Sequence, residues 1–333
     1  MTTKRTVSTR RIWFKGLVAG GLLLGLAGTA IAASSWPNRT VTIVVPFSAG
    51  GTTDVVARLM ADRLSKLWGQ SVVVENKLGA GGNVGTAAVA RSDPDGYTLL
   101  MASGSILTVN PHLYKDLPYN VQKDFIPVTN VAAGPMVVVT SKGVPVSTLT
   151  ELIEYARKNP GKLNMGSAGL GSQVHMAGEN FAYAADIKVT HVPYRGEAAA
   201  YTDLMANQID LVVGNAGAVS GLVESGRINA LAVTGDSRLP MLPNVPTAAE
   251  AGMPGFTNYG WFGFVVPAGT PREIVEKIHD DTVQVLAMPD VKERIEQLGM
   301  KPVGNTPAEF QKALKEESAY WAKVVKERNI VIQ

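Results

Sequence analysis

The sequence predicts an α/β protein with two lobes, and three observations support this fold class. Short runs rich in Val and Ile alternate with amphipathic helical patterns after residue 40, which is typical of parallel strands covered by helices. Four predicted strands run into a glycine-rich turn and then a helix, two in each half of the chain. The 333 residues are enough for two domains of about 150 residues each.

The first elements show the pattern clearly. Residues 40–46 (TVTIVVP) form a β-branched run, and a helix is expected at 54–68. Thr53 or Asp54 is the expected N-cap of this helix, and Gly69 is its expected end. The apolar face of the helix comprises Val55, Val56, Leu59, Leu64 and Leu67. Further strands are expected at 71–76 and 97–103, with a short helix at 83–91 between them.

The second half repeats the alternation, and the C-terminal part departs from it. Strands are expected at 136–141, 163–167, 189–194, 209–214 and 228–235, and helices at 148–158, 173–184, 198–207 and 219–225. After residue 254 the pattern becomes an aromatic-rich strand at 259–266, followed by a helix with a Pro at its start and two more helices at about 290–297 and 307–327.

Residues 1–32 have the features of a cleaved export signal. A basic start is followed by an apolar stretch from Gly16 to Thr29 and by the small-residue site Ala30-Ile31-Ala32. The apolar stretch is shorter than the roughly 20 residues that span a membrane. We expect cleavage near Ala32 and a periplasmic location. Residues 9–15 also resemble a twin-arginine signal, so the sequence leaves the export route open.

Removal of this segment changes the charge of the chain. It holds five of the 31 Lys and Arg residues and no acidic residue, so 26 basic side chains remain against 28 Asp and Glu, a net charge of −2. No basic patch is left to suggest nucleic-acid binding. The absence of cysteine excludes disulfides and thiol nucleophiles. An exported chain without cysteine is most simply a bacterial periplasmic protein.

The four glycine-rich junctions are the candidate binding features. They lie at 50–54, 79–85, 166–175 and 192–200, each between a strand and a helix. The unpaired N–H groups at a helix N-terminus, next to a flexible glycine loop, suit an anion. Each junction alone could be a tight turn without a ligand. Four in one chain predict two lobes whose helix N-termini face one shared cleft that binds a small anion.

These junctions are not nucleotide motifs. Residues 50–54 lack the Lys-Ser/Thr pair of a phosphate-binding P-loop, and the glycines of 79–85 read GxGxxxG rather than GxGxxG. Catalytic patterns are also missing, because the chain has neither a GxSxG elbow nor an HExxH pair. Its four histidines are scattered without metal-ligand spacing. We therefore expect a protein that is not an enzyme and has no metal or cofactor.

His175 leaves two interpretations open. It falls in the first turn of the helix that starts near Gln173, where a histidine is usually a structural hydrogen-bonding residue. The alternative is a catalytic base, which would make the protein an exported hydrolase that uses His175 with Ser167 or Ser172. The missing acid–base constellation argues against that alternative.

Seven segments together resemble a known family. The chain from Trp36 onward is similar to the Bug family, the extracytoplasmic solute receptors of tripartite tricarboxylate transporters. The similar segments occur in family order and are PFSAGGTTD, VVENKLGAGGNVGTAAVARSDPDGYTLL, NPHLY, GSAGLGSQVH, VPYRG, LAVTGDSRLPMLPNVPTAAEAGMPGF and PAGTP. The combination is specific, although no fragment is specific alone.

The resemblance implies a two-domain periplasmic-binding-protein (Venus flytrap) fold with a ligand cleft between the lobes. Domain 1 is then discontinuous, with residues 36–135 and 257–333, and domain 2 comprises 136–256. In the family, backbone groups of opposing loops hold a ligand carboxylate, partly through ordered water. The corresponding ligand-binding residues of this chain are Phe47, Ala49, Gly50, Gly51 and Thr52 on one lobe and Ser167, Gly169, Gly171, Ser172 and His175 on the other. We add four candidate ligand-binding residues near these loops, Ser103, Tyr194, Glu197 and Asn215.

Two places depart from the family pattern. Relatives usually have a small residue after VPYRG and a proline two positions on, where this chain has Glu197 and Ala199. Many have an Asp-Asn pair where this chain has Gly214-Asn215. Either Glu197 pairs with a cationic or hydrogen-bond-donating part of the ligand, or it points to solvent beside its helix N-terminus, where a negative charge is mildly favourable.

The sequence thus predicts a periplasmic receptor that captures a small organic carboxylate and delivers it to the membrane subunits of a tripartite transporter. The candidate ligands are di- or tricarboxylates, aromatic acids and acidic amino acids. We expect a monomer that binds no nucleic acid. A ligand sensor that signals to a membrane kinase is the alternative within the same fold.

Overall fold

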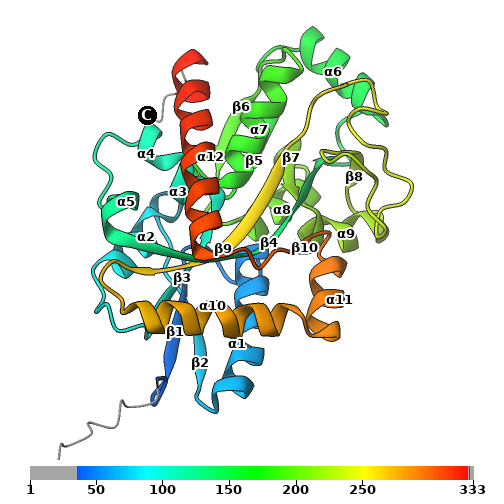
Figure 1. Cartoon of the computed structure of the whole chain (residues 1–333). Coiled ribbons are helices and arrows are strands. Elements are labelled where there is room, and N and C mark those ends of the chain that lie inside the picture. The colour runs from blue at the N-terminus through cyan, green and yellow to red at the C-terminus, as the bar shows by residue number, and fades with distance from the viewer. Residues whose placement is uncertain (1–35, 329, 331–333) are drawn as a thin grey trace, which may run out of the picture. The chain divides into compact units, whose positions relative to one another are not determined.

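The fold is an α/β arrangement around one run of hydrogen-bonded strands (Figure 1). The computed structural model describes residues 36–328 and 330, so the predicted export signal lies outside the described residues. The strands are β1 Val41–Val45, β2 Val72–Asn76, β3 Thr98–Ser103, β4 Phe125–Thr140, β5 Asn164–Ser167, β6 Thr190–Pro193, β7 Leu211–Asn215, β8 Asn229–Val233, β9 Tyr259–Pro267 and β10 Lys301–Pro302. Their order is β2-β1-β3-β9-β4-β7-β5-β6, with β8 and β10 also paired to β4.

Strand β4 belongs to two groups of strands. Its first part pairs antiparallel with β9, from Phe125 opposite Pro267 to Pro135 opposite Tyr259. Its last five residues pair antiparallel with β7, starting with Met136 opposite Asn215. The first group therefore contains β1, β2, β3, β9 and β10, the second contains β5 to β8, and the chain passes between them within a single strand.

The sheet is mixed, whereas the sequence pattern predicts parallel strands. Pairs β1–β2, β1–β3, β5–β6 and β5–β7 are parallel, as expected for strands joined by helical crossovers. The central strands β4 and β9 are antiparallel to their neighbours. The segment 125–135 was not predicted as a strand, because its prolines and its glycine weaken the local β signal.

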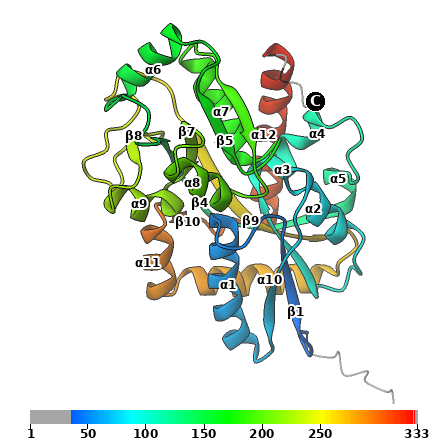
Figure 2. The same cartoon turned by 180° about the vertical axis from the view of Figure 1, so that it is seen from behind.

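Helices cover both groups of strands (Figure 2). Their bounds are α1 Thr52–Trp68, η1 Ala80–Gly82, α2 Asn83–Ala90, α3 Gly104–Thr108, α4 Asn110–Leu113, α5 Val121–Asp124, α6 Leu149–Lys158, α7 Gln173–Ala184, α8 Glu197–Met205, α9 Ala216–Glu224, α10 Arg272–Leu286, α11 Pro289–Gln297 and α12 Pro307–Glu327. The predicted end of α1 is confirmed, since Gly69 has a left-handed φ of 63°.

The predicted cap of α1 is wrong. Its N-cap is Gly51, with no side-chain hydrogen bond, and both Thr53 and Asp54 lie inside the helix. The Asp54 carboxylate instead accepts a hydrogen bond from the N–H of Gly50, in the loop before the helix. The first N–H groups of α1 are therefore not taken by a local capping side chain.

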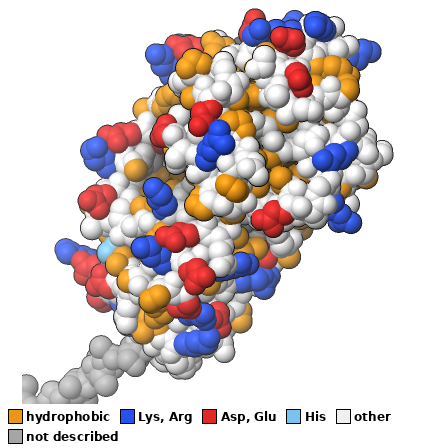
Figure 3. Space-filling model, turned by 90° about the vertical axis from the view of Figure 1, so that its right-hand side faces the viewer, with side chains coloured by type: hydrophobic (Ala, Val, Ile, Leu, Met, Phe, Trp, Pro, Cys, Tyr) orange, Lys and Arg blue, Asp and Glu red, His pale blue; other side chains and the backbone are white. Residues whose placement is uncertain are grey.

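Apolar side chains fill the space between strands and helices. In the second group, Val138, Val212 and Phe181 are fully buried, in one cluster with Leu152 and Leu204. In the first group, Ile43, Leu99 and Phe264 are fully buried. Trp261 and Phe262 of β9 are also buried, so these two aromatic side chains belong to the core. On the face that Figure 3 shows, acidic and basic side chains are interspersed rather than gathered by sign.

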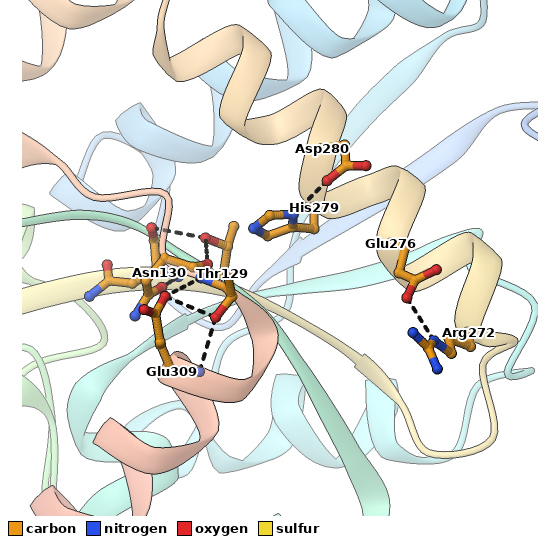
Figure 4. A network of polar contacts seen from close by, with 9 residues as sticks. Thr129, Asn130, Arg272, Glu276, His279, Asp280 and Glu309 are labelled. Atoms are coloured by element: carbon orange, nitrogen blue, oxygen red, sulfur yellow. Dashed lines mark hydrogen bonds and ion pairs between the residues drawn. The ribbon is translucent and has the colours of Figure 1, made fainter.

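Polar contacts tie the start of α12 to β4 (Figure 4). The side-chain Oδ1 of Asn305 accepts a hydrogen bond from the N–H of Asn130, and its main-chain oxygen accepts one from Thr129 Oγ1, both at 2.8 Å. Thr306 and Glu309 then form a capping box at the first turn of α12. Thr129 and Asn130 lie where the β4–β9 register shifts, so Asn305 satisfies polar groups at an irregular part of the ladder.

Replacing Asn305 tests this contact. We expect Asn305→Ala to lower the free energy of unfolding by about 1–3 kcal/mol, because the N–H of Asn130 loses its acceptor in a partly buried place. Asn305→Asp keeps an acceptor and is the matched control, with a smaller loss. Urea denaturation measures both, and equal losses for the two variants would contradict the role of the Oδ1 atom.

Candidate functional site

The four glycine-rich junctions face one another in two pairs. A Cβ on Gly196 would lie 1.9 Å from Ser48 Oγ, so the 192–200 junction meets the loop before α1. A Cβ on Gly81 would lie 1.9 Å from the carbonyl oxygen of Leu170, so the 79–85 junction meets the 166–175 junction. Neither contact leaves room for a side chain on the glycine, because Gly196 packs against the Ser48 side chain and Gly81 against the Leu170 backbone.

Two side chains add hydrogen bonds across the same gap. The Tyr114 hydroxyl donates to the carbonyl oxygen of Leu170 at 2.8 Å. Gln173, the first residue of α7, accepts hydrogen bonds at its Oε1 from the N–H groups of Gly104 (3.3 Å) and Trp261 (3.2 Å). The two groups of strands are thus held together around the junctions.

A small cavity remains between them. Its volume is about 20 Å³, room for about one water molecule. An organic acid is larger than this, so its entry requires the walls to separate or a lining side chain to move. The lining residues are Phe47, Ser48, Gly51, Thr53, Ser103, Ala168, Ser172, Gln173, Val174, Glu197, Asn215 and Phe262.

The Glu197 side chain points into this cleft and is 6% exposed. Its Oε1 accepts a hydrogen bond from the N–H of Thr52 at 2.5 Å, and its Oε2 accepts from Asn215 Nδ2 at 2.8 Å and from the Tyr201 hydroxyl at 3.3 Å. The interpretation that Glu197 points to solvent is therefore wrong. Thr52 is the first residue of α1, so its N–H has no partner within the helix and favours an anion.

The Tyr201 hydroxyl acts as a donor in this arrangement. Burial, together with the neighbouring Glu197 carboxylate, raises the pKa of Tyr201 well above its usual value. The phenol therefore stays protonated at neutral pH, and its O–H donates a hydrogen bond to Glu197 Oε2.

Three buried hydroxyl groups near the cavity are unused. Within the described part of the chain, Ser48 Oγ, Thr52 Oγ1 and Ser103 Oγ have no hydrogen-bond partner. Thr52 and Ser103 are each 2% exposed. A buried hydroxyl without a partner costs free energy, so these three groups are candidate contacts for a polar ligand.

The loop before α1 is held by Asp54 and Asn76. Asp54 accepts hydrogen bonds from Gly50 N, from Asn76 Nδ2 and from Arg58 Nε. Asn76 Nδ2 also donates to the carbonyl oxygen of Phe47. Burial alone would raise the pKa of Asp54, but these hydrogen bonds and the Arg58 charge lower it below its usual value. Asp54 therefore stays ionised and fixes the loop that carries Phe47 to Gly51.

The two histidines of the second group lie behind the cavity. The rings of His175 and His191 stack with their centroids 3.9 Å apart. His175 Nδ1 accepts a hydrogen bond from Gly171 N, and His191 Nε2 lies 2.6 Å from Ser167 Oγ. Ser172 Oγ accepts from the backbone N–H of His175 as the N-cap of α7. His175 thus has a structural role, and its ring is hydrogen-bonded to neither predicted serine.

The predicted site residues divide into three sets. Phe47, Gly51, Ser103, Ser172, Glu197 and Asn215 line the cavity, and Thr52 contacts Glu197. Ala49 and Gly50 are exposed outside the lining. Ser167, Gly169, Gly171, His175 and Tyr194 lie outside the lining as well. The Tyr194 hydroxyl donates to Asp203 at 2.6 Å, and burial and the Asp203 carboxylate raise its pKa to about 12.

Sequence reasoning missed six lining residues. Thr53 lies within the first junction and Ser48 just before it, and Ala168, Gln173 and Val174 lie within the third, so all five could have been included with these junctions. The sequence gives no sign that Phe262 lines the cavity, because a large aromatic residue in a strand is expected to be buried whether or not it also borders a cleft.

The described residues hold neither a metal-binding cluster nor a membrane-spanning helix. Over residues 36–328 and 330, no three His, Cys, Asp or Glu side chains group as a metal site would require. Within the same residues, no helix is long and apolar enough to cross a membrane.

Comparison with known proteins places the chain in a family. Residues 56–330 match the family described as the tripartite tricarboxylate transporter family receptor. The chain belongs to this family. The receptor is also 37% identical to the periplasmic binding protein BugD, with a TM-score of 0.85 over 90% of this chain and all of that one. It therefore has the two-lobe periplasmic-binding-protein fold and is a solute-binding receptor of the Bug type rather than an enzyme.

Two further solved structures are similar to the receptor over most of its length. One is Rpa4515 of R. palustris with adipate, 38% identical, with a TM-score of 0.86 over 89% of this chain and 99% of that one. The other is MatC (Rpa3494) of Rhodopseudomonas palustris with bound malate, 34% identical, with a TM-score of 0.83 over 87% of this chain and all of that one.

The stacked histidines predict a pH dependence of stability. Burial and the neighbouring His175 lower the pKa of His191 from 6.5 to about 4. Between these values the unfolded chain binds more protons, so the contribution of His191 to stability is complete above pH 6.5 and is lost as the pH falls toward 4. We expect His191→Gln to flatten the decline of the unfolding free energy between pH 7 and about 4.5. Urea denaturation at several pH values measures this, and an unchanged slope would contradict it.

The contact of Gly81 with Leu170 predicts that a larger residue at position 81 weakens ligand binding. Gly81→Ala places a methyl group against the Leu170 carbonyl, so we expect it to hold the facing loops apart and to weaken ligand binding. Its φ of +61° adds backbone strain. Gly161→Ala is the matched control, because Gly161 has a φ of +74° and no heavy atom within 4 Å of the added Cβ. Equal ligand affinity of the two variants in calorimetric titration would contradict the expected closure contact.

Proposed function

We propose that this receptor captures a small organic carboxylate between its two lobes in the periplasm and delivers it to the membrane subunits of a tripartite transporter. One observation carries the proposal. The buried hydroxyls of Ser48, Thr52 and Ser103, which have no hydrogen-bond partner within the described residues, supply donors at or beside a cavity that no Lys or Arg lines. Such neutral, fixed donors suit a carboxylate.

The similar proteins support this choice of ligand class. Rpa4515 has been solved with adipate and MatC with malate, and both share the fold of this chain over most of its length. Di- and tricarboxylates, aromatic acids and acidic amino acids remain the candidate ligands. Their common feature is one carboxylate that these hydroxyl groups can bind.

Binding follows from closure of two lobes. We assign residues 36–135 and 257–333 to one lobe and 136–256 to the other. The chain then passes from the first lobe to the second after Pro135, where β4 stops pairing with β9 and starts pairing with β7, and it returns just before Tyr259, which is opposite Pro135. A ligand carboxylate that contacts the loop before α1 and the N-terminus of α7 ties both lobes together. Cleavage near Ala32 would release the mature receptor, as a monomer, into the periplasm.

Ligand-induced stabilisation tests the proposal. The mature chain, residues 33–333, is unfolded and refolded to remove bound ligand and is then screened against carboxylates, their amides and neutral sugars. Linkage gives about 2.7 kcal/mol of stabilisation at a ligand concentration 100 times the Kd, so a true ligand raises the melting temperature clearly. No shift with any carboxylate would contradict the proposal.

The hydroxyl of Ser103 provides a test of the site. We expect Ser103→Ala to weaken binding of the best carboxylate by about 1 kcal/mol, because the hydroxyl is buried, lines the cavity and has no other partner within the described residues. Ser105→Ala is the control, since Ser105 is equally buried and unpartnered but lies outside the lining. Calorimetric titration measures both, and equal affinities would remove Ser103 from the site.

A further inference from the structure

We propose that Glu197 permanently occupies one carboxylate-binding position of the cleft, and that the receptor therefore selects a monocarboxylate whose other end presents an N–H donor, an amide or an ammonium group, and discriminates against dicarboxylates. This inference rests on the proposed function and names the ligand class within it. Glu197 is then a specificity-determining residue of the receptor.

The donors around Glu197 are those that a ligand carboxylate would use. They come from both groups of strands: the N–H of Thr52 at the start of α1, and Asn215 Nδ2 and the Tyr201 hydroxyl on the opposite side. A free carboxylate bound between lobes would close the cleft through such a set. Here the chain itself supplies that carboxylate from the first residue of α8.

The surrounding residues are shaped around this side chain. A Cβ on Gly51 would lie 3.4 Å from Glu197 Cγ, which is van der Waals contact, so the Glu197 side chain packs directly against the N-cap of α1. A Cβ on Gly214 would lie 1.9 Å from the Tyr201 hydroxyl, so the absence of a side chain there leaves room for the donor to Glu197. These two glycines and three hydrogen bonds fix Glu197 within the cleft rather than leaving it free to swing out.

The charge of Glu197 then decides what fits next to it. A carboxylate has about four acceptor sites, and the described residues fill three of those of Glu197. The remaining capacity accepts a hydrogen bond from an N–H group. A second carboxylate in the same place would meet a like charge with no Lys or Arg in the lining to offset it. Two like charges about 4 Å apart in a partly buried site lower affinity by about tenfold or more.

Matched ligand pairs test the inference. The refolded mature chain is titrated by calorimetry with adipate, its monoamide and 6-aminohexanoate, and with succinate, glutarate and their monoamides. We expect the monoamide or the amino acid to bind about tenfold or more tightly than the diacid of the same length. The affinity of the monoamide relative to that of the amino acid shows whether the cleft prefers an amide or an ammonium donor.

Variants of Glu197 complete the test. Glu197→Gln keeps the size of the side chain and removes the charge, and Glu197→Gly also frees the donors of Thr52 and Asn215, so we expect both to shift the preference toward diacids by about tenfold or more. Glu224→Gln is the control, because Glu224 is exposed on α9 and its loss removes the same charge outside the cleft. If Glu197→Gly does not fold, as judged by urea denaturation, the ratio of diacid to monoamide affinity of Glu197→Gln alone tests the inference.

The outcomes separate the inference from the function on which it rests. If carboxylates bind but diacids equal their monoamides, or if Glu197→Gln leaves the ratio unchanged, the inference on Glu197 is wrong and the receptor function stands. If no carboxylate binds the natural chain, Glu197→Gln or Glu197→Gly, both the proposed function and this inference are wrong.

Discussion

The hydrogen bond between the N–H of Thr52 and the Glu197 carboxylate joins the two groups of strands at the centre of the cleft. It exists because α1 starts at a glycine with no capping side chain, so the electrostatically positive end of the helix is open to an acceptor from elsewhere. The loop that presents this helix end is held by Asp54 and Asn76. The close approach of the junctions, the small cavity and the burial of Glu197 all depend on this arrangement.

Most of the fold could be predicted from local patterns. The parallel strands and long helices have strong periodicity, and α7 has the predicted bounds of 173–184. The first part of β4 could not be predicted, because the ladder with β9 and the contacts of Asn305 make it a strand, whereas its own residues do not favour one. The cap of α1 was mispredicted for the opposite reason. Asp54 is a good N-cap residue by type, but a tertiary hydrogen bond from Asn76 and an i,i+4 ion pair with Arg58 use its carboxylate.

The candidate site was predictable as a set of loops rather than as a set of contacts. Glycine-rich turns before helices mark the four junctions, and residues of the first, third and fourth line the cavity. Which side chains face the cavity depends on distant partners. Sequence position alone allowed Glu197 to point to solvent, and its hydrogen bonds with Thr52, far away in the chain, and with Asn215 and Tyr201 decide its direction. Similarly, Ser167 and His175 have polar side chains on the right loop, but they pair with His191 and Gly171 instead of facing the cavity.

The shared strand β4 also has a consequence for the order of folding. The second group of strands uses a continuous stretch of chain, from Met136 in β4 to Val233 in β8. The first group needs β9, which pairs with β3 across that whole stretch, as when Ser103 meets Phe262. Closing a long loop costs entropy before its contacts form, so the continuous group can assemble first. During synthesis from the N-terminus, β1 to β3 therefore remain without their central partner until the last third of the chain has been made.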